Sequence, residues 1–238
     1  MDLPVTIYFP DEIIEQPLRE LENKKRVELD FSFHEITQRK RIAFMGKRVF
    51  DICFSLWVIL IFLTWMIPLI ALLIKIDSRG PVFFSQERMG KAGSVFICFK
   101  FRTMGFNKIL GTDFVITGFG KFLRQSNLDE LPQFFNVLLG NMSIVGPRPH
   151  MYRDCRRFSG YIAHYDSRNI VKPGITGWAQ VKGYHGPVSD PVAIFHRYYW
   201  DMMYIKKFSF PLDMKIVFET AWQRITWLLK YPFFRNQR

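Results

Sequence analysis

Two neighbouring acidic residues, Asp129 and Glu130, stand in the segment of this sequence that is richest in residues able to do chemistry. Pro132 follows them, and because proline is tolerated only in the first turn of a helix, we expect a helix that begins near residues 127–129 and ends at Gly140. The two carboxylates would then lie at a helix N-terminus, where free backbone N–H groups and the helix dipole favour negative charge. Acids at such a position are commonly simple caps, so their presence alone does not establish a site.

Two arginines flank the acidic pair: Arg124 precedes it and Arg148 follows it, within a Gly-Pro-Arg-Pro sequence. A helix N-terminus can also bind phosphate, and two carboxylates beside two guanidinium groups suit a metal-bound diphosphate. One carboxylate could ligate Mg²⁺, which prefers oxygen ligands and substrate phosphates, while the other attacks phosphorus as a nucleophile. The arginines would neutralise the phosphoryl oxygens in the transition state. The segment therefore predicts phosphoryl transfer with Mg²⁺ as cofactor.

The element expected to place this site is an uncharged apolar run from Ile52 to Ile74. A helix of that length, at about 1.5 Å per residue, matches a bilayer core of roughly 30 Å. Basic residues mark the cytoplasmic side of a membrane segment. They stand on both sides of this run, as Arg39, Lys40, Arg41, Lys47 and Arg48 before it and Lys75, Arg79, Arg88 and Lys91 after it. Pro68 kinks a helix, so a re-entrant helix that returns to the same face is favoured over a crossing helix, although crossing helices also tolerate proline.

The chain divides by composition into four parts. Residues 1–38 are mixed and charged and predict an N-terminal extension without chemistry, and residues 39–78 hold the basic approach and the membrane helix. Residues 79–210 are expected to form a cytoplasmic catalytic domain, which begins with two β-prone runs around a turn at Gly90–Gly93. Residues 211–238 begin with an amphipathic helix expected at the membrane interface, although a core helix fits its spacing equally well. The fold class expected is mostly α with a small β-hairpin, in a monotopic membrane protein.

The formal net charge is +12, from 33 Lys and Arg against 21 Asp and Glu. This excess suits attraction to anionic lipid headgroups, at roughly 1 kcal/mol per basic residue near the surface, or an anionic substrate such as a nucleotide. No basic helix stripe, zinc-ligand spacing or aromatic motif accompanies the charge, so nucleic acid is not expected as a partner. The three cysteines have no disulfide-framework spacing and indicate the reducing side of the membrane.

Five sequence blocks together resemble the bacterial sugar transferases, the monotopic phosphoglycosyl transferases that move a sugar 1-phosphate from a nucleotide sugar to polyprenyl phosphate. The blocks follow the family's order within roughly residues 45–220, as GPVFFSQERMG, KFRTM, DELPQ, the NVLxGxMSxVGPRP stretch and KPGITGWAQVKG. A closing pattern of Asp-x-x-Tyr and Ser-x-x-x-Asp also matches, at Asp201, Tyr204, Ser209 and Asp213. The chain looks like a short form of the family with a soluble N-terminal extension.

The resemblance implies a mechanism centred on the acidic pair. Asp129 would attack the sugar-bearing phosphorus of a UDP-sugar, release UMP and form an aspartyl phosphosugar, which undecaprenyl phosphate would then attack. Glu130 would hold Mg²⁺ or assist proton transfer. The residues implied to line the phosphate and uridine region are Lys100, Arg102, Arg124, Arg148 and Asp201.

The resemblance also implies a place in the cell and a pathway. The enzyme would work at the cytoplasmic face of a bacterial inner membrane, in contact with membrane lipids, and would start a surface glycan such as capsule, O-antigen or exopolysaccharide. Downstream glycosyltransferases would be its partners, a homodimer is left open, and the residues do not indicate which sugar is transferred.

Three positions depart from the family pattern. Ile67 stands where the family has a serine before the kink proline Pro68, and Thr64, one turn earlier, could supply the missing hydroxyl. Asn141 stands in place of an acidic residue and Val115 in place of a basic one, which leaves the roles of these two positions open.

Other interpretations remain at this stage. The segment of residues 173–177 is either a turn in which Gly174 and Gly177 take positive φ or a loop that approaches phosphate. A catalytically inactive scaffold that recruits glycan-assembly enzymes is the alternative to an enzyme, and the intact Asp129–Glu130 pair argues against it. A third hypothesis is a basic single-pass protein that binds nucleic acid or anionic lipid.

Overall fold

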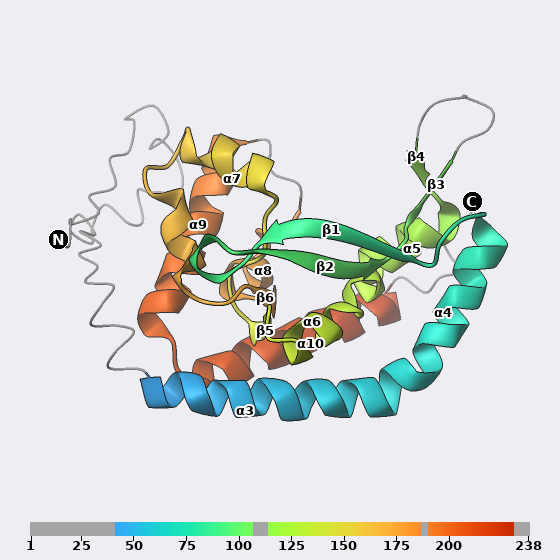
Figure 1. The fold of residues 1–238 in the computed structure, drawn as a ribbon, viewed down its shortest axis with the longest axis horizontal. Coiled ribbons are helices and arrows are strands. Elements are labelled where there is room, and N and C mark those ends of the chain that lie inside the picture. Colours follow the sequence, from blue (N-terminus) through green and yellow to red (C-terminus); the bar gives the residue numbers. More distant parts are fainter. Residues whose placement is uncertain (1–40, 107–113, 187–189, 231–238) are drawn as a thin grey trace.

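The computed structural model describes residues 41–106, 114–186 and 190–230, and within them the chain is mostly helical with three small two-stranded sheets (Figure 1). This confirms the expected mostly α fold with a small β element. The expected extension at residues 1–38 and the end of the chain after residue 230 lie outside the described residues.

A long helix with a bend opens the described part of the chain. It consists of α3 (Arg41–Val58), a π-helical turn (Ile59–Leu63) and α4 (Thr64–Asp77), and Figure 1 shows α4 turning away from the axis of α3. The segment Phe44–Asp77 is long and apolar enough to cross a membrane, by length and composition. Pro68 lies inside α4, one turn after the π-helical turn, and π-turns and prolines are the usual causes of such bends.

The side chain of Thr64 stabilises this bend. Its hydroxyl donates to the carbonyl oxygens of Ile59 at 3.0 Å and Leu60 at 3.1 Å. The indole N–H of Trp65 donates to the carbonyl of Ile61 at 2.8 Å. A π-turn shifts the backbone bonds by one residue and leaves a carbonyl without its usual amide donor. The hydroxyl that the sequence lacks before Pro68 is therefore supplied one turn earlier, by Thr64.

An antiparallel hairpin follows, formed by β1 (Phe83–Met89) and β2 (Val95–Phe101) around a short 3₁₀ turn at Lys91–Gly93. This confirms the two β-prone runs expected around Gly90–Gly93. A second pair, β3 (Met104–Phe106) and β4 (Phe114–Ile116), was not expected, because only three residues of each strand pair and a polar connection separates them in the sequence.

The acidic pair lies between two short helices on one side of the hairpin. The elements are α5 (Gly118–Ser126), a 3₁₀ turn (Leu128–Glu130), α6 (Gln133–Leu138) and then strand β5 (Ser143–Val145). The expected single helix from residues 127–129 is therefore wrong at its start, because Pro132 sits at the N-cap of α6 and the acids form a separate turn before it. Its expected end is close to the observed one, since Gly140 takes a positive φ of 87° just after α6.

Strand β5 pairs in parallel with β6 (Gly174–Thr176). Neither Gly174 nor Gly177 takes a positive φ, so the expected turn is wrong. Gly174 is required instead by close approach, since a Cβ there would lie 2.1 Å from the amide nitrogen of Gly146. The five-residue segment thus joins two parts of the fold that are distant in sequence.

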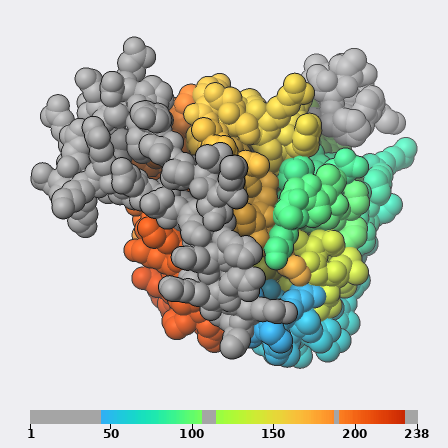
Figure 2. Space-filling view, turned by 60° about the vertical axis from the view of Figure 1, so that its left-hand side comes forward, coloured from blue at the N-terminus to red at the C-terminus, as the bar shows by residue number. Residues whose placement is uncertain are grey.

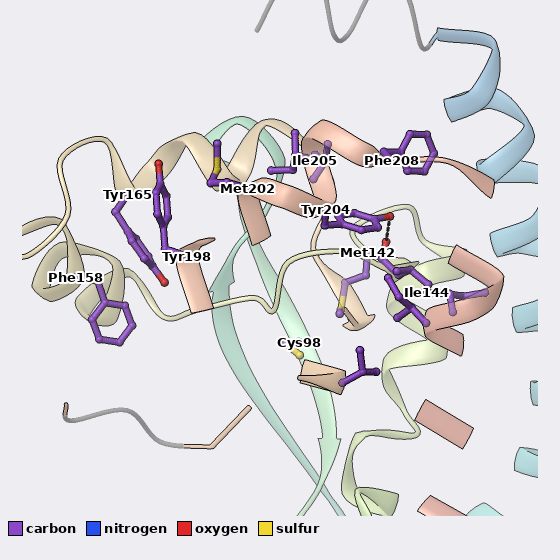
Figure 3. Close-up of a cluster of buried hydrophobic side chains, with 14 of the residues drawn as sticks. Cys98, Met142, Ile144, Phe158, Tyr165, Tyr198, Met202, Tyr204, Ile205 and Phe208 are labelled. Atoms are coloured by element: carbon purple, nitrogen blue, oxygen red, sulfur yellow. Dashed lines mark hydrogen bonds between the residues drawn. The ribbon is translucent and has the colours of Figure 1, made fainter. Parts of the chain in front are cut away.

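The remaining helices enclose the core beside these strands. They are α7 (Tyr152–Ser159), a 3₁₀ turn (Tyr165–Ile170), α8 (Trp178–Val181), α9 (Pro191–Lys207) and α10 (Phe210–Lys230). Asp190 caps α9 by accepting from the amide of Val192 at 3.1 Å. Figure 3 shows the buried side chain of Tyr204 in α9 beside Met142 and Ile144 of the β5 region, with Met202 nearer to Tyr198 and Ile205 of the same helix.

A buried ion pair fastens the long helix to α10. The ammonium of Lys47 in α3 lies 2.6 Å from a carboxylate oxygen of Asp213, and the hydroxyl of Tyr204 donates to the other oxygen at 2.8 Å. All three side chains are buried. These contacts fix the direction in which α3 leaves the rest of the fold.

Large apolar side chains are exposed along the second half of this helix and along α10. In α4 and the π-turn they include Leu60, Trp65, Leu72 and Ile76, and in α10 they include Phe218, Trp222, Ile225 and Leu229. Exposed apolar area of this extent is typical of a surface that contacts a membrane or another protein.

Candidate active site

Asp129 and Glu130 project from a tight turn whose geometry is set by Asn127. Helix α5 ends at Ser126, and Asn127 then takes the left-handed conformation, with φ of 60°. Asparagine tolerates this region better than most residues because its short polar side chain can hydrogen-bond locally. The chain reverses into the 3₁₀ turn, and both acids become buried, with only 8% of Asp129 and 6% of Glu130 exposed.

Glu130 is held by two cations. Its carboxylate accepts from the ammonium of Lys100 in β2 at 2.5 Å and from both terminal nitrogens of Arg148, at 2.7 and 3.2 Å. Burial alone would raise the pKa of Glu130, but the charges of Arg148 and Lys100 outweigh it and hold this pKa well below its usual range. Glu130 is therefore a permanent anion with a fixed position.

Asp129, in contrast to Glu130, is not held by a cation in the described part of the chain. Within the described residues, no group donates a hydrogen bond to its carboxylate. Burial, reinforced by the neighbouring charge of Glu130, raises the pKa of Asp129 to about 6 against the opposing pull of Lys100, Arg148 and Arg124. A carboxylate without donors and with a raised pKa is more basic and more nucleophilic than one that is bound, and pairs with pKa values pushed apart are typical of catalytic sites.

Of the other two predicted cations, the charge of Arg124 acts on Asp129, whereas Arg102 is bound to the end of α4. The guanidinium of Arg124 in α5 donates from Nε to the hydroxyl of Thr103 at 2.8 Å. Arg102 donates to the carbonyl oxygens of Ser78 and Arg79, at 2.8 and 2.6 Å, immediately after α4 ends. Arg102 thus ties the strand that carries Lys100 to the end of the membrane-type helix.

Asp201 does not contact the acidic pair directly but is linked to it through Arg168 and Arg148. It is buried in α9 and accepts two hydrogen bonds from Arg168, at 3.0 and 2.5 Å. Arg168 also donates to the backbone carbonyl of Arg148 at 2.8 Å. The structure therefore places Asp201 behind Arg148, where it positions the segment that holds Glu130, and not in contact with the acidic pair.

Sequence reasoning missed Arg168 and His150, which complete this support. The ring nitrogen Nδ1 of His150 lies 3.0 Å from the hydroxyl of Tyr165 and 3.1 Å from Arg168, and Nε2 lies 3.2 Å from Arg197. Burial, together with the charges of the surrounding arginines, lowers the pKa of His150 well below its usual value, so the imidazole is neutral. No local motif marks these residues, because their partners are distant in the sequence.

Two of the three positions that depart from the family pattern, Asn141 and Val115, make no contact with the acidic pair in the described part of the chain. Asn141 is exposed just after α6, and Val115 is exposed in the middle of β4. Neither is among the residues that bind Glu130 or shift the pKa of either acid.

The residues present fit a magnesium ion that shares its ligands with phosphate. Within the described residues no group of three or more acidic, histidine or cysteine side chains could form a complete metal cage. Mg²⁺ usually takes one or two carboxylates and completes its octahedron with substrate phosphate and water. Among the described residues none donates to Oδ1 or Oδ2 of Asp129, and Oε2 of Glu130 accepts only the longer bond from Arg148, so carboxylate oxygens remain open on both acids.

An apolar bent helix beside two buried carboxylates and several cations is typical of a membrane-associated transferase that acts on phosphate groups. The family model described as bacterial sugar transferase matches residues 42–227. The chain belongs to this family.

Two of the similar proteins are named as transferases that act on undecaprenyl phosphate, and a third is named for exopolysaccharide production. The chain is 48% identical over 160 residues to a UDP-glucose:undecaprenyl-phosphate glucose-1-phosphate transferase of Xanthomonas campestris pv. campestris. It is 43% identical over 183 residues to a UDP-N-acetylgalactosamine-undecaprenyl-phosphate N-acetylgalactosaminephosphotransferase of Aeromonas hydrophila. It is 40% identical over 191 residues to the exopolysaccharide production protein PSS of Rhizobium leguminosarum bv. phaseoli.

These relatives differ in length. The alignments cover 64%, 73% and 76% of this chain, respectively, but only 33% of the Xanthomonas protein and 42% of the Aeromonas protein, against 95% of the Rhizobium protein. In this chain the matched residues 42–227 include both the bent helix and the acidic pair.

Proposed function

We propose that this protein transfers a sugar 1-phosphate from a UDP-sugar to undecaprenyl phosphate. The observation that carries the proposal is the contrast within the acidic pair: Glu130 is fixed by Lys100 and Arg148, while Asp129 is buried, accepts no hydrogen bond from the described residues and has a raised pKa. The names of the relatives support the two substrates.

In the first step Asp129 is the nucleophile. One carboxylate oxygen attacks the phosphorus that bears the sugar, the bond from that phosphorus to the bridging oxygen breaks, and UMP leaves with the electron pair. The product on the protein is an aspartyl phosphosugar, a mixed anhydride. The absence of bound donors on Asp129 favours attack, because no hydrogen bond has to break first.

In the second step the lipid phosphate is the nucleophile. An oxygen of undecaprenyl phosphate attacks the phosphorus of the intermediate, and the carboxylate of Asp129 leaves unchanged. The product is an undecaprenyl diphosphate sugar. The same carboxylate thus acts first as nucleophile and then as leaving group, for which a pKa near 6 is suited, since a weaker acid than an ordinary aspartic acid attacks better and still departs as an anion at neutral pH.

The cations stabilise the negative charge that both steps concentrate at phosphorus. Arg148 and Lys100 are held in place by Glu130, and Arg124 is held by Thr103, so little reorganisation is needed when the phosphates bind. Mg²⁺, held by Glu130 with a phosphate oxygen, would supply further neutralisation of the diphosphate. Asp201 acts indirectly, through Arg168 and the backbone of Arg148.

The bent helix would place this site at the membrane surface. We infer that it is re-entrant, with the basic residues before α3 and after α4 on the cytoplasmic face of the bacterial inner membrane. Its bend at the π-turn and Pro68, and its exposed apolar side chains, support this arrangement. The interfacial position of α10 is part of the same proposal. A soluble nucleotide sugar and a membrane-bound acceptor can then reach one site from opposite sides.

The product would be the first membrane-bound intermediate of a surface glycan, and downstream glycosyltransferases would act on it. The relative named for exopolysaccharide production supports this class of glycan among those considered. The relatives name different sugars, glucose in one and N-acetylgalactosamine in another. The donor is therefore to be found with a panel of UDP-sugars.

The test is release of UMP by purified protein supplied with Mg²⁺, undecaprenyl phosphate and each UDP-sugar. One donor is expected to give turnover, and Asp129→Asn should abolish it. Asp166→Asn is the matched control, because Asp166 is exposed and belongs to a different turn. Undiminished UMP release in Asp129→Asn would exclude the proposed nucleophile. Absence of turnover with every donor, combined with retained binding of glycan-assembly enzymes, would support the scaffold instead.

A further inference from the structure

A cavity whose lining includes several charged side chains lies beside α3, away from the acidic pair. It has a volume of about 270 Å³ and is formed by the first half of α3, the turn between β1 and β2, strand β5 and the segment that leads into β6. Neither Asp129 nor Glu130 lines it. In Figure 2 the surface of α3 (blue) lies below that of the hairpin (green).

The cavity has an excess of positive charge. Four of its lining residues are cations and one is an acid, namely Lys47, Arg48, Lys91, Lys172 and Asp51. The charge of Lys47 is balanced by Asp213. Three cations thus remain against the single carboxylate of Asp51, which accepts a hydrogen bond from the amide of Ile144 at 3.1 Å. The net charge of the lining therefore favours an anion.

A buried hydroxyl in the wall lacks a partner. Ser143 in β5 is 1% exposed and lines the cavity, and its Oγ makes no hydrogen bond with the described residues. A buried hydroxyl without a partner costs free energy, so such groups usually mark a bound water, ion or ligand. Here the hydroxyl can donate to an anion held by the lysines.

Lys172 is a second lining residue whose charge lies close to another positive charge. Burial lowers the pKa of Lys172, and the positive charge of Arg48 lowers it further. Both side chains approach Gly140, since a Cβ built there would lie 3.6 Å from each of their terminal nitrogens. An anion between these cations would remove the repulsion between them.

The cavity and the acidic pair are at opposite ends of α6. Arg48 donates to the carbonyl oxygens of Val137 and Leu138, at 2.6 and 2.9 Å, at the C-terminal end of α6, whereas Glu130 precedes its N-terminal end. Six helical residues span about 9 Å. A ligand in the cavity would therefore not occupy the position of the substrate phosphates, although it would contact the same helix.

We propose that this cavity is a separate binding site for a phosphate group, carried by a membrane phospholipid headgroup or by free phosphate. Lys91, Lys172 and Arg48 neutralise the anion, and the hydroxyl of Ser143 donates to it. The apolar part of the wall, which includes Phe44 and Ile170, is able to contact the glycerol carbons of a phosphodiester headgroup. The site lies along the helix that we place at the membrane, but the proposal does not depend on catalysis at Asp129.

The experiment measures thermal unfolding of the full chain, purified in neutral detergent at constant ionic strength. Two probes distinguish the sources: inorganic phosphate, and dihexanoyl phosphatidylglycerol with dihexanoyl phosphatidylcholine as the zwitterionic reference. The variants are Ser143→Ala, which changes one buried atom, and the double substitution Lys91→Gln with Lys172→Gln. A double substitution of the exposed Lys207 and Lys215 to Gln is the charge-matched control.

We expect one of the two anionic probes to raise the unfolding temperature of the wild type and of the control double variant in a saturable way. In the Lys91/Lys172 variant its apparent affinity should fall by about tenfold or more, as removal of two nearby charges predicts. Ser143→Ala should weaken binding without lowering the unfolding temperature of the free protein. Equal responses of all four proteins to both probes, or no response to either, would overturn the proposal. The same ligand response in Asp129→Asn would separate this site from the active site.

Discussion

At the scale of single residues, the acidic pair shows how two neighbours acquire different chemical roles. Asp129 and Glu130 are adjacent in one 3₁₀ turn and equally buried, yet burial dominates the pKa of one and two cations dominate the pKa of the other. The difference arises from direction: Glu130 points at Lys100 and Arg148, whereas Asp129 meets no donor from the described residues.

The raised pKa of Asp129 predicts the pH dependence of the first chemical step. Above a pH of about 6 the carboxylate is ionised and can attack phosphorus, and below it the bound proton removes the nucleophile. The rate of UMP release in a single turnover should therefore be level above pH 7 and fall by about tenfold per unit well below pH 6. An inflection near pH 4, as for an ordinary aspartate, would show that burial does not control this group.

Asp129→Asn should make the protein more stable while it abolishes activity. The folded pKa lies above the unfolded value, from 3.8 to about 6, so ionisation of Asp129 opposes folding at neutral pH. At 1.36 kcal/mol per pKa unit, the amide should raise the free energy of unfolding at pH 7.5 by up to about 3 kcal/mol. Because protonation relieves the same cost, the gain should shrink as pH falls below 6 and vanish near pH 4. Urea unfolding at these pH values provides the measurement, and a loss of stability at every pH would contradict the account.

Part of the site was predictable from the sequence. The residue types beside the acids predict Arg124 and Arg148, and the family resemblance adds Lys100. The structure brings all three close enough to influence Asp129, although their roles in binding phosphate remain predictions. Arg168 and His150 could not be found, because a buried arginine that supports a backbone carbonyl has no local sequence signal.

At the scale of elements, the long helix bends where backbone hydrogen bonding is interrupted twice, first by the π-turn and then by Pro68. Both interruptions lie within ten residues of each other, and the hydroxyl of Thr64 lies between them. Ile67 cannot supply a donor, so the hydroxyl of Thr64 stabilises the carbonyls of Ile59 and Leu60, and the indole of Trp65 stabilises that of Ile61.

Thr64→Val should therefore destabilise the protein. Valine keeps the shape of threonine but leaves the carbonyl of Leu60 without the hydroxyl donor, at an expected loss of about 0.5–1.5 kcal/mol. Thr226→Val is the control, since the hydroxyl of Thr226 in α10 donates at 2.8 Å to Trp222, four residues back, within an ordinary α-helix. Unfolding temperatures in the same detergent compare the two. Equal losses would mean that Thr64 has no special role at the bend.

Long helices and strands could be predicted from the sequence, whereas short elements could not. The apolar helix, the first hairpin and the terminal helix were expected because each has a sustained pattern, and α10 runs from Phe210 to Lys230 close to the expected stretch. The strands β3 to β6 are three residues long, and no periodic pattern can develop over so few positions. The start of α6 was misplaced because Pro132 fits both a first helical turn and an N-cap.

At the scale of the whole molecule, the exposed apolar surface and the buried polar contacts belong to different regions. Leu60, Trp65 and Ile76 of the bent helix are more than half exposed, whereas Lys47 and Asp213 fix the base of the same helix inside the protein. The helix is therefore anchored at its base and also packs Ile70 and Ile74 against the protein, while its other apolar side chains face outward, as on a surface that contacts a membrane or another protein.

The proposed re-entrant topology predicts that both ends of the helix face the same side of a membrane. Single cysteines at Met45 and at Arg79, each in a Cys53→Ser background because Cys53 is exposed, should react with a membrane-impermeant thiol reagent from the same side of sealed inner-membrane vesicles. Labelling of the two positions from opposite sides would establish a crossing helix. It would then need a different explanation how a cytoplasmic nucleotide sugar and a membrane-bound acceptor reach the same site.

The covalent state of one side chain tests the central claim most directly. Enzyme mixed with the UDP-sugar that supports turnover, without undecaprenyl phosphate, and quenched in acid should gain the mass of one sugar phosphate, and peptide mapping should place it on Asp129. Addition of undecaprenyl phosphate before the quench should remove this mass, and Asp129→Asn should never acquire it. An adduct on any other residue, or the absence of an adduct while UMP is being released, would contradict the account.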